Sequence, residues 1–161
     1  GALLGPNFIL SALGVVLSFP GSNDQRIHRD QNPLFTLPVD TALPPYAVTL
    51  GMPLVDMVPE MGGTSILVGS NRQEGTEGLS YSTPILNMGS GYLFDYRALH
   101  FGQANRSRKV RPLLTAVFSK PWWRDWQNFE KGGQKPIEII GEPAELSDVF
   151  KQRARLSIAG R

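Results

Sequence analysis

Two histidines and one aspartate are the side chains of this sequence best suited to bind a metal ion together. The chain has only two histidines, His28 and His100, and Asp30 follows the first of them after one intervening residue. Histidine is the commonest metal ligand in proteins, and residues i and i+2 of an extended strand project from the same face. His28 and Asp30 can therefore chelate one ion, and His100 is the one candidate for a third ligand from another strand.

Two imidazoles and one carboxylate on one face of an octahedron leave three coordination positions open. This arrangement is associated with Fe(II) enzymes that activate oxygen. A His-x-Asp tripeptide is also common by chance, and its alternative interpretation is a surface histidine beside an aspartate. The chain has no cysteine, which excludes thiolate metal sites, disulfides and cysteine nucleophiles.

Arg111 stands at the start of a strongly apolar segment, residues 111–119, a short distance after His100. An arginine that heads a buried strand needs an anionic partner, and its planar guanidinium suits a carboxylate better than a lysine would. The alternatives are a structural ion pair or a solvated strand end.

Four groups of spaced residues carry a resemblance to one known family. They are Gln25-x-x-His28-x-Asp30, then Pro53-Leu-Val-Asp56 with Gly62-Gly63-Thr64, then Gly69-Ser70, and last His100-x-Gly102-x-x-Asn105-x-Ser107-x-x-x-Arg111. In order and spacing they resemble the phytanoyl-CoA hydroxylase superfamily of Fe(II)- and 2-oxoglutarate-dependent dioxygenases. The resemblance covers about residues 8–125, and the spaced His-Asn-Ser-Arg group is its most specific part.

The resemblance implies a double-stranded β-helix that holds Fe(II) through His28, Asp30 and His100. It also implies that Arg111 pairs with the distal carboxylate of 2-oxoglutarate. The expected reaction uses O₂ and decarboxylates 2-oxoglutarate to succinate while a small organic substrate is hydroxylated. Halogenating relatives replace the metal-binding carboxylate by a small residue, so the presence of Asp30 disfavours halogenation.

Two departures from the family pattern concern the edges of the site. Asn71 stands where the family often has a histidine that is not an iron ligand. Only 27 residues precede His28, whereas the family normally carries a longer region there. We therefore expect residues 1–161 to form a single β-helix oxygenase core that is truncated at the N-terminus.

Several polar residues near these motifs have a structural alternative. Gln25 is interpreted either as a contact to the cosubstrate or as a partner of the backbone, with neither favoured. Asn105 and Ser107 are expected to bond to backbone groups of the loop after His100. Asp56 and Arg97 are expected to belong to the scaffold.

The aromatic and basic residues that follow His100 also have a structural and a functional interpretation. Core packing is favoured over substrate stacking for Trp122, Trp123 and Trp126, because buried clusters are the commoner use of such rings. The basic run 106–111 has no interleaved aromatic residue. It is interpreted as a solvated loop that ends in the cosubstrate arginine.

The elements that must position these residues are short apolar runs separated by glycine and proline, a pattern typical of all-β folds. About eight strands are predicted, the number of a cupin-like jelly roll. They lie at residues 8–19, 25–30, 46–58 with a break at 51–53, 64–68, 83–87, 91–96, 98–101 and 111–119. Residues 33–45 and 71–82 are predicted as loops, and the apolar spacing of residues 144–158 predicts a short C-terminal helix.

The composition and charge of the chain limit the kinds of partner that it is expected to bind. The net charge of +2 comes from 16 basic and 14 acidic residues without a basic stripe, so no nucleic-acid partner is expected. The most apolar stretch, residues 8–19, is too short to span a bilayer. We expect a cytoplasmic protein with a small-molecule substrate, and the sequence carries no signal of its oligomeric state. Two other functions remain open: a non-catalytic jelly-roll domain that keeps the metal site, and a cupin-like enzyme that uses Mn or Ni without 2-oxoglutarate.

Overall fold

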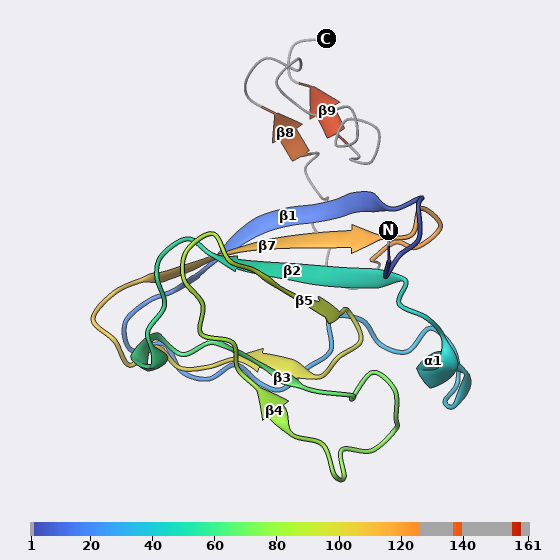
Figure 1. The fold of residues 1–161 in the computed structure, drawn as a ribbon, viewed down its shortest axis with the longest axis horizontal. Coiled ribbons are helices and arrows are strands. Elements are labelled where there is room, and N and C mark those ends of the chain that lie inside the picture. Colours follow the sequence, from blue (N-terminus) through green and yellow to red (C-terminus); the bar gives the residue numbers. More distant parts are fainter. Residues whose placement is uncertain (1, 126–136, 140–155, 159–161) are drawn as a thin grey trace.

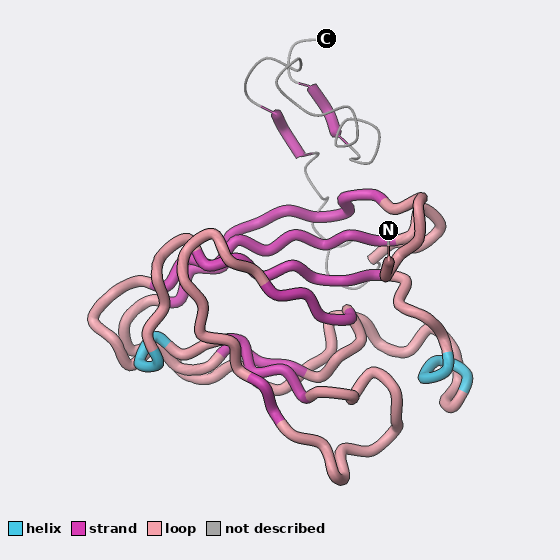
Figure 2. Tube along the Cα trace, in the orientation of Figure 1, coloured by secondary structure: helices cyan, strands magenta, loops and turns pink. Residues whose placement is uncertain are grey.

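The computed structural model describes residues 2–125, 137–139 and 156–158, and this part of the chain is almost entirely strand and loop (Figures 1 and 2). The strands are β1 (Ile9–Ser18), β2 (Ala47–Pro53), β3 (Thr64–Leu67), β4 (Tyr81–Ser82), β5 (Tyr92–Asp95), β6 (His100–Gly102), β7 (Arg111–Ser119), β8 (Ile137–Ile139) and β9 (Leu156–Ile158). The helices are one turn each, α1 (Val39–Ala42) and a 3₁₀ turn, η1 (Pro59–Met61). In the described part, no helix has the length and apolar character that crossing a membrane requires.

The strands β1 to β7 form two antiparallel sheets, and β8 and β9 pair as a separate two-stranded parallel sheet. The larger sheet has the order β1-β7-β2-β5, and the smaller has the order β4-β3-β6. An isolated antiparallel bridge between His28 and His100 adds the segment around residue 28 to the free edge of β6. The chain thus passes repeatedly between the two layers that Figure 1 shows, as in a jelly roll with its two Greek keys. The predicted double-stranded β-helix is confirmed.

The long strand β7 lies between β1 and β2 and presents alternate side chains to the space between the sheets. Leu113, Thr115 and Val117 face this interior, as expected for side chains two residues apart on a strand. The buried apolar core gathers beside it and consists of Ala12, Tyr46, Ala47, Tyr96, Val117 and Trp123. This core fills part of the space between the two sheets, and a cavity lies next to it, with Tyr96 and Val117 in contact with both.

The predicted break in the strand at residues 51–53 is wrong. β2 keeps an unbroken register with β7 from Ala47 to Pro53. The Tyr92 ring occupies the space where a side chain at position 51 would lie, since a Cβ built on Gly51 would be 2.3 Å from Cζ of that ring. Gly51 therefore serves close packing inside the sheet, and the strand ends at Pro53, which has no N–H to continue it.

The strand predicted at residues 83–87 is also absent, since no strand covers these residues. β4 lies just before them and pairs Ser82 with Ile66 and Tyr81 with Leu67 of β3. Pro84 lacks a backbone donor, so a sheet ladder is unfavourable from that position onward. The β-branched and apolar residues that suggested the strand therefore run as an extended loop.

The predicted C-terminal helix falls mostly on residues 144–155, which lie outside the described residues. Its last three residues, Leu156–Ile158, form β9 and pair in parallel with β8, so the helix is wrong there. The apolar residues Leu156 and Ile158 are two positions apart, a spacing that fits a strand as well as a helix end.

Arg97 is the most deeply buried charge of the described scaffold, with 2% of its surface exposed. Its guanidinium forms an ion pair of 2.9 Å with Asp95 and one of 3.5 Å with Asp40. It also donates to the Leu43 carbonyl at 3.1 Å and lies over the Tyr46 ring. These contacts tie the loop around α1 to the turn between β5 and β6, a scaffold role as expected.

Replacing Arg97 by methionine is expected to lower the free energy of unfolding by about 3–5 kcal/mol, because two buried carboxylates lose their counter-charge. Urea unfolding followed by circular dichroism measures the change. The matched control is Arg106→Met, which removes an exposed guanidinium and should leave the unfolding midpoint unchanged. Equal midpoints for both variants would contradict the role given to Arg97.

Candidate metal centre

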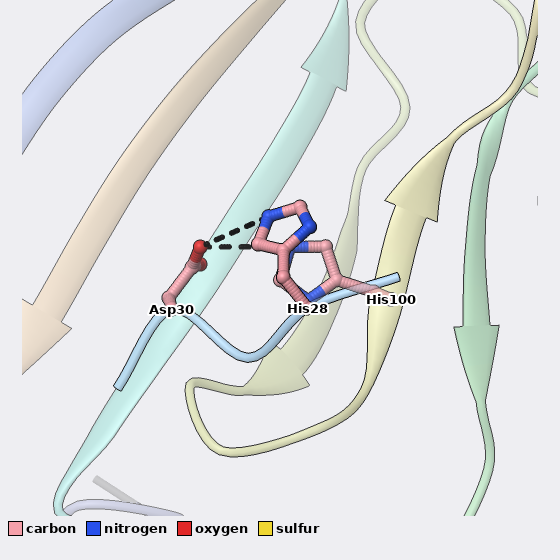
Figure 3. Close-up of side chains that lie close together, drawn as sticks. All are labelled: His28, Asp30 and His100. Atoms are coloured by element: carbon pink, nitrogen blue, oxygen red, sulfur yellow. Dashed lines mark ion pairs between the residues drawn. The ribbon is translucent and has the colours of Figure 1, made fainter. Parts of the chain in front are cut away.

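The structure brings His28, Asp30 and His100 together between the two sheets (Figure 3). The Nε2 atoms of His28 and His100 lie 3.7 and 3.6 Å from the same oxygen, Oδ1 of Asp30. One ligand atom from each residue lies within 4.8 Å of the other two. Among the described residues this is the one group of three or more histidine and carboxylate side chains with such spacing.

The backbone explains why two histidines so distant in sequence meet. The His28 N–H donates to the His100 carbonyl at 3.0 Å, and the His100 N–H donates to the His28 carbonyl at 2.9 Å. Residues that exchange both bonds are directly opposite in an antiparallel pair, and their side chains lie on the same face. The two imidazole centroids are accordingly 4.4 Å apart.

The outer nitrogen of each histidine is held by a backbone carbonyl. Nδ1 of His28 lies 2.7 Å from the Arg26 oxygen, and Nδ1 of His100 lies 3.0 Å from the Ala98 oxygen. A carbonyl only accepts, so each Nδ1 carries the proton and each neutral ring keeps its lone pair on Nε2. Hydrogen bonding of the second ring nitrogen is the usual way in which proteins orient metal-binding histidines.

The electrostatics of the centre also suit a cation. Burial raises the pKa of the Asp30 carboxyl, an effect that His100 and His28 oppose. Burial lowers the pKa of His100, an effect that Asp30 opposes. Burial thus favours the neutral form of His100, which is the form that binds a metal ion, and it disfavours the negative charge of Asp30, which a bound cation would offset. Two nitrogen donors and one carboxylate fit Fe(II), and the residues present suit that ion.

A cavity of about 270 Å³ contains the three candidate ligands and extends to Arg111 at the head of β7. Arg111 is 5% exposed and donates from Nη1 to the Met61 carbonyl at 3.0 Å and to the Gln103 carbonyl at 3.4 Å. Burial lowers the pKa of its guanidinium. No carboxylate of the described residues forms an ion pair with Arg111, so this part of the chain supplies no counter-ion to the buried cation of the cavity.

Gln25 fits both interpretations of its role. Its Oε1 accepts the Gly102 N–H at 2.7 Å, its own N–H donates to the Gly102 carbonyl at 2.8 Å, and it also lines the cavity. A Cβ on Gly102 would lie 2.8 Å from that Oε1 and 3.5 Å from Nη2 of Arg111. The absence of a side chain at Gly102 therefore lets Gln25 and Arg111 approach each other.

The loop after β6 uses its polar residues as expected. The Asn105 side chain donates to the carbonyls of Ser18 and Lys109, at 2.9 and 2.8 Å, and Ser107 donates through its N–H and its hydroxyl to Asn105 Oδ1. Asp56 accepts the Met88 N–H at 2.9 Å and thus supports a loop outside the cavity.

The tryptophans have different environments. Trp123 is 2% exposed and packs on Tyr46 and Tyr96, as core packing predicted. Trp122 is 65% exposed, so the expected burial is wrong for this residue, although its ring contacts Tyr46. Trp126 lies outside the described residues.

Sequence reasoning missed several cavity residues. Tyr92, Phe94 and Tyr96 all line the cavity, and their spacing of two residues on one strand was a usable signal. The Tyr92 hydroxyl donates to Oγ1 of Thr64 at 2.7 Å, and the Phe94 ring lies 4.8 Å from the His100 ring. The buried hydroxyl of Thr49 also lines the cavity and has no hydrogen-bond partner among the described residues.

The fold has known relatives among solved structures. EvdMO1 matches with a TM-score of 0.61 at 21% identity, over 74% of this chain and 29% of its own. SnoN, a non-haem α-ketoglutarate-dependent epimerase from nogalamycin biosynthesis, matches with a TM-score of 0.58 at 24% identity, over 73% of this chain and 51% of its own. SnoK, an α-ketoglutarate-dependent carbocyclase from the same biosynthesis, matches with a TM-score of 0.57 at 20% identity, over 73% and 51%.

These similarities establish a fold that is shared with non-haem iron enzymes dependent on α-ketoglutarate, which is another name for 2-oxoglutarate. The chain spans about half the length of SnoN and SnoK and less than a third of EvdMO1. No protein-family model matches the sequence. No curated protein matches it either. Membership of the phytanoyl-CoA hydroxylase superfamily therefore stays a prediction.

Proposed function

We propose that this protein is an Fe(II)- and 2-oxoglutarate-dependent dioxygenase that hydroxylates a small organic substrate. The observation that carries the proposal is a buried arginine in the same cavity as a His-Asp-His group, with no carboxylate of the described residues paired to it. A dicarboxylate cosubstrate would satisfy both ends of this cavity at once. The fold shared with SnoN and SnoK supports the same class of chemistry.

In this proposal each group of residues has one task. His28, Asp30 and His100 hold Fe(II), which supplies the oxidising chemistry when it is bound together with 2-oxoglutarate and O₂. Arg111 binds the distal carboxylate of the cosubstrate, and the carbonyls of Met61 and Gln103 aim its guanidinium. Bidentate pairing of this kind both orients and neutralises a carboxylate.

The rest of the lining would orient the substrate and exclude water. Val16, Leu113, Val117 and Phe94 give the cavity an apolar wall next to the metal ligands. Apart from His28, Asp30, His100 and Arg111, only the two tyrosines among the lining residues can ionise. We therefore propose that the part of the substrate near the metal is uncharged.

The direct test is anaerobic addition of Fe(II) and 2-oxoglutarate to the purified protein. A weak visible charge-transfer absorption is expected, and it should not form with either component alone. Admission of O₂ in the presence of a panel of small organic compounds should then produce succinate, and mass spectrometry of the compounds would identify the oxidised product. Absence of both the absorption and succinate would contradict the proposal.

The nature of the product distinguishes reactions within the class. SnoN is an epimerase and SnoK a carbocyclase, so enzymes of this fold also carry out reactions other than hydroxylation. We propose hydroxylation here. A product heavier than its substrate by one oxygen atom, labelled from ¹⁸O₂, is the expected result.

A further inference from the structure

Asp30 lies beyond the end of the sheet pairing that holds the two histidines. The ladder of the smaller sheet ends at the His28–His100 bridge, and Figure 3 shows Asp30 on a loop that leaves it. Backbone pairing therefore determines where the histidines lie but does not determine where the carboxylate lies. A useful metal centre needs its ligands within about 0.5 Å of the productive geometry, so some other contact must fix this loop.

Arg29, between the two ligands, makes such a contact. Neighbouring residues of an extended chain project to opposite sides, and Arg29 is not among the residues that line the cavity of the metal ligands. Its Nη1 donates to the Ser70 carbonyl at 2.8 Å and also to the Arg97 carbonyl.

Both acceptors of Arg29 belong to rigid turns. Ser70 is fully buried, its hydroxyl donates to the Leu67 carbonyl at 2.7 Å, and it accepts the Leu99 N–H at 2.8 Å. Arg97 is held by its ion pair with Asp95. Both bonds come from the same nitrogen, Nη1, so the end of the Arg29 side chain is held at one point between two fixed carbonyls.

The turn that receives Arg29 also orients the third ligand. Its next residue, Ala98, accepts the Nδ1 proton of His100 at 3.0 Å. The Arg29 contact therefore joins the loop with His28 and Asp30 to the turn that aims His100. We propose that Arg29 is a positioning residue for the metal centre, which holds the carboxylate of Asp30 at the distance and angle that one ion requires. This inference rests on the metal site of the proposed function.

The test compares Arg29→Met with wild-type protein by anaerobic titration calorimetry with Fe(II), repeated with Co(II). Loss of a direct hydrogen-bond partner of a metal ligand costs about 10- to 100-fold in metal affinity. Arg29 acts on the loop that carries the ligands and not on a ligand side chain, so a rise of the dissociation constant near the lower end of that range is expected. Arg29→Lys, which keeps a donor and a charge but loses the fork, should give an intermediate value.

Arg72→Met is the matched control. Arg72 also donates from Nη1 to two loop carbonyls, those of Leu43 and Thr41, at 2.9 and 3.5 Å, but it adjoins no metal ligand. The Arg72→Met substitution should change the melting temperature of the metal-free protein without changing the dissociation constant for metal. A purely structural Arg29 would behave in the same way.

The outcomes separate the two proposals. If wild-type protein binds neither metal, the proposed function fails. If wild-type binds metal and the folded Arg29→Met protein binds it equally well, only the positioning role is overturned. Should Arg29→Met fail to fold, the same comparison is made with Arg29→Lys, for which a wild-type dissociation constant overturns the role.

Discussion

Replacing Asp30 by asparagine is expected to raise the dissociation constant for Fe(II) by more than about 100-fold, beyond the cost of losing an outer partner. The amide has the shape of the carboxylate but lacks the charge that a hard cation requires from this ligand. Only His28 and His100 then remain as strong ligands. Anaerobic calorimetry with Fe(II) measures the loss, and the charge-transfer absorption with 2-oxoglutarate should disappear with it.

The same substitution is expected to leave the metal-free protein at least as stable as wild-type at neutral pH. Burial raises the folded-state pKa of Asp30, so its charged form opposes folding once the pH lies above the pKa of the unfolded state. Asparagine removes this cost. The stability difference should vanish in acid, where Asp30 is protonated in both states, and urea unfolding at several pH values would show it.

Asp56→Asn controls for the loss of a carboxylate elsewhere, since Asp56 is exposed and supports a loop. It should not change the dissociation constant for Fe(II). An Asp30→Asn protein that binds Fe(II) like this control would remove Asp30 from the metal site. A marked loss of stability in metal-free Asp30→Asn would instead show that the carboxylate has a structural role.

The strands that sequence patterns predicted well are those with a strong local signal. Residues 8–19 and 111–119 are long apolar runs bounded by turn residues, and they form β1 and β7 nearly as expected. Their pairing with each other could not be predicted. This pairing joins segments about a hundred residues apart, such as Ile9 and Ser119. It depends on how the two sheets pack around the interior, and the local sequence of either strand does not specify that packing.

The candidate site was predicted to a greater extent than the sheet topology, because the chain has few histidines that could serve as metal ligands. With two histidines in the chain, a shared site needed only the His-x-Asp spacing and the resemblance. Residues that act through backbone carbonyls were missed for the opposite reason. Arg29 bonds to the carbonyls of Ser70 and Arg97, and every residue has a carbonyl, so no residue type marks the acceptor.

Arg111→Met is expected to raise the dissociation constant for 2-oxoglutarate by about 30-fold or more while the affinity for metal stays within about 2-fold of wild-type. A charged hydrogen-bonded pair that loses one buried partner typically costs 2–5 kcal/mol of binding, which corresponds to about 30-fold or more. Methionine retains much of the apolar stem and removes a buried cation whose pKa burial already lowers. The metal-free protein should therefore remain folded. Calorimetry of the Fe(II)-loaded protein with 2-oxoglutarate makes the measurement.

Arg108→Met is the control, because Arg108 is an exposed cation of the loop just before β7. It should bind 2-oxoglutarate like wild-type, which would show that net charge alone does not attract the cosubstrate. The Arg111 result also separates the three functions considered for this chain. A metal enzyme that uses no 2-oxoglutarate would turn over regardless of Arg111→Met. A non-catalytic binding domain would bind 2-oxoglutarate through Arg111 and yet form no succinate when O₂ is admitted. Only a dioxygenase would lose cosubstrate binding and succinate formation together, because the guanidinium that anchors the cosubstrate also determines where its oxidation takes place.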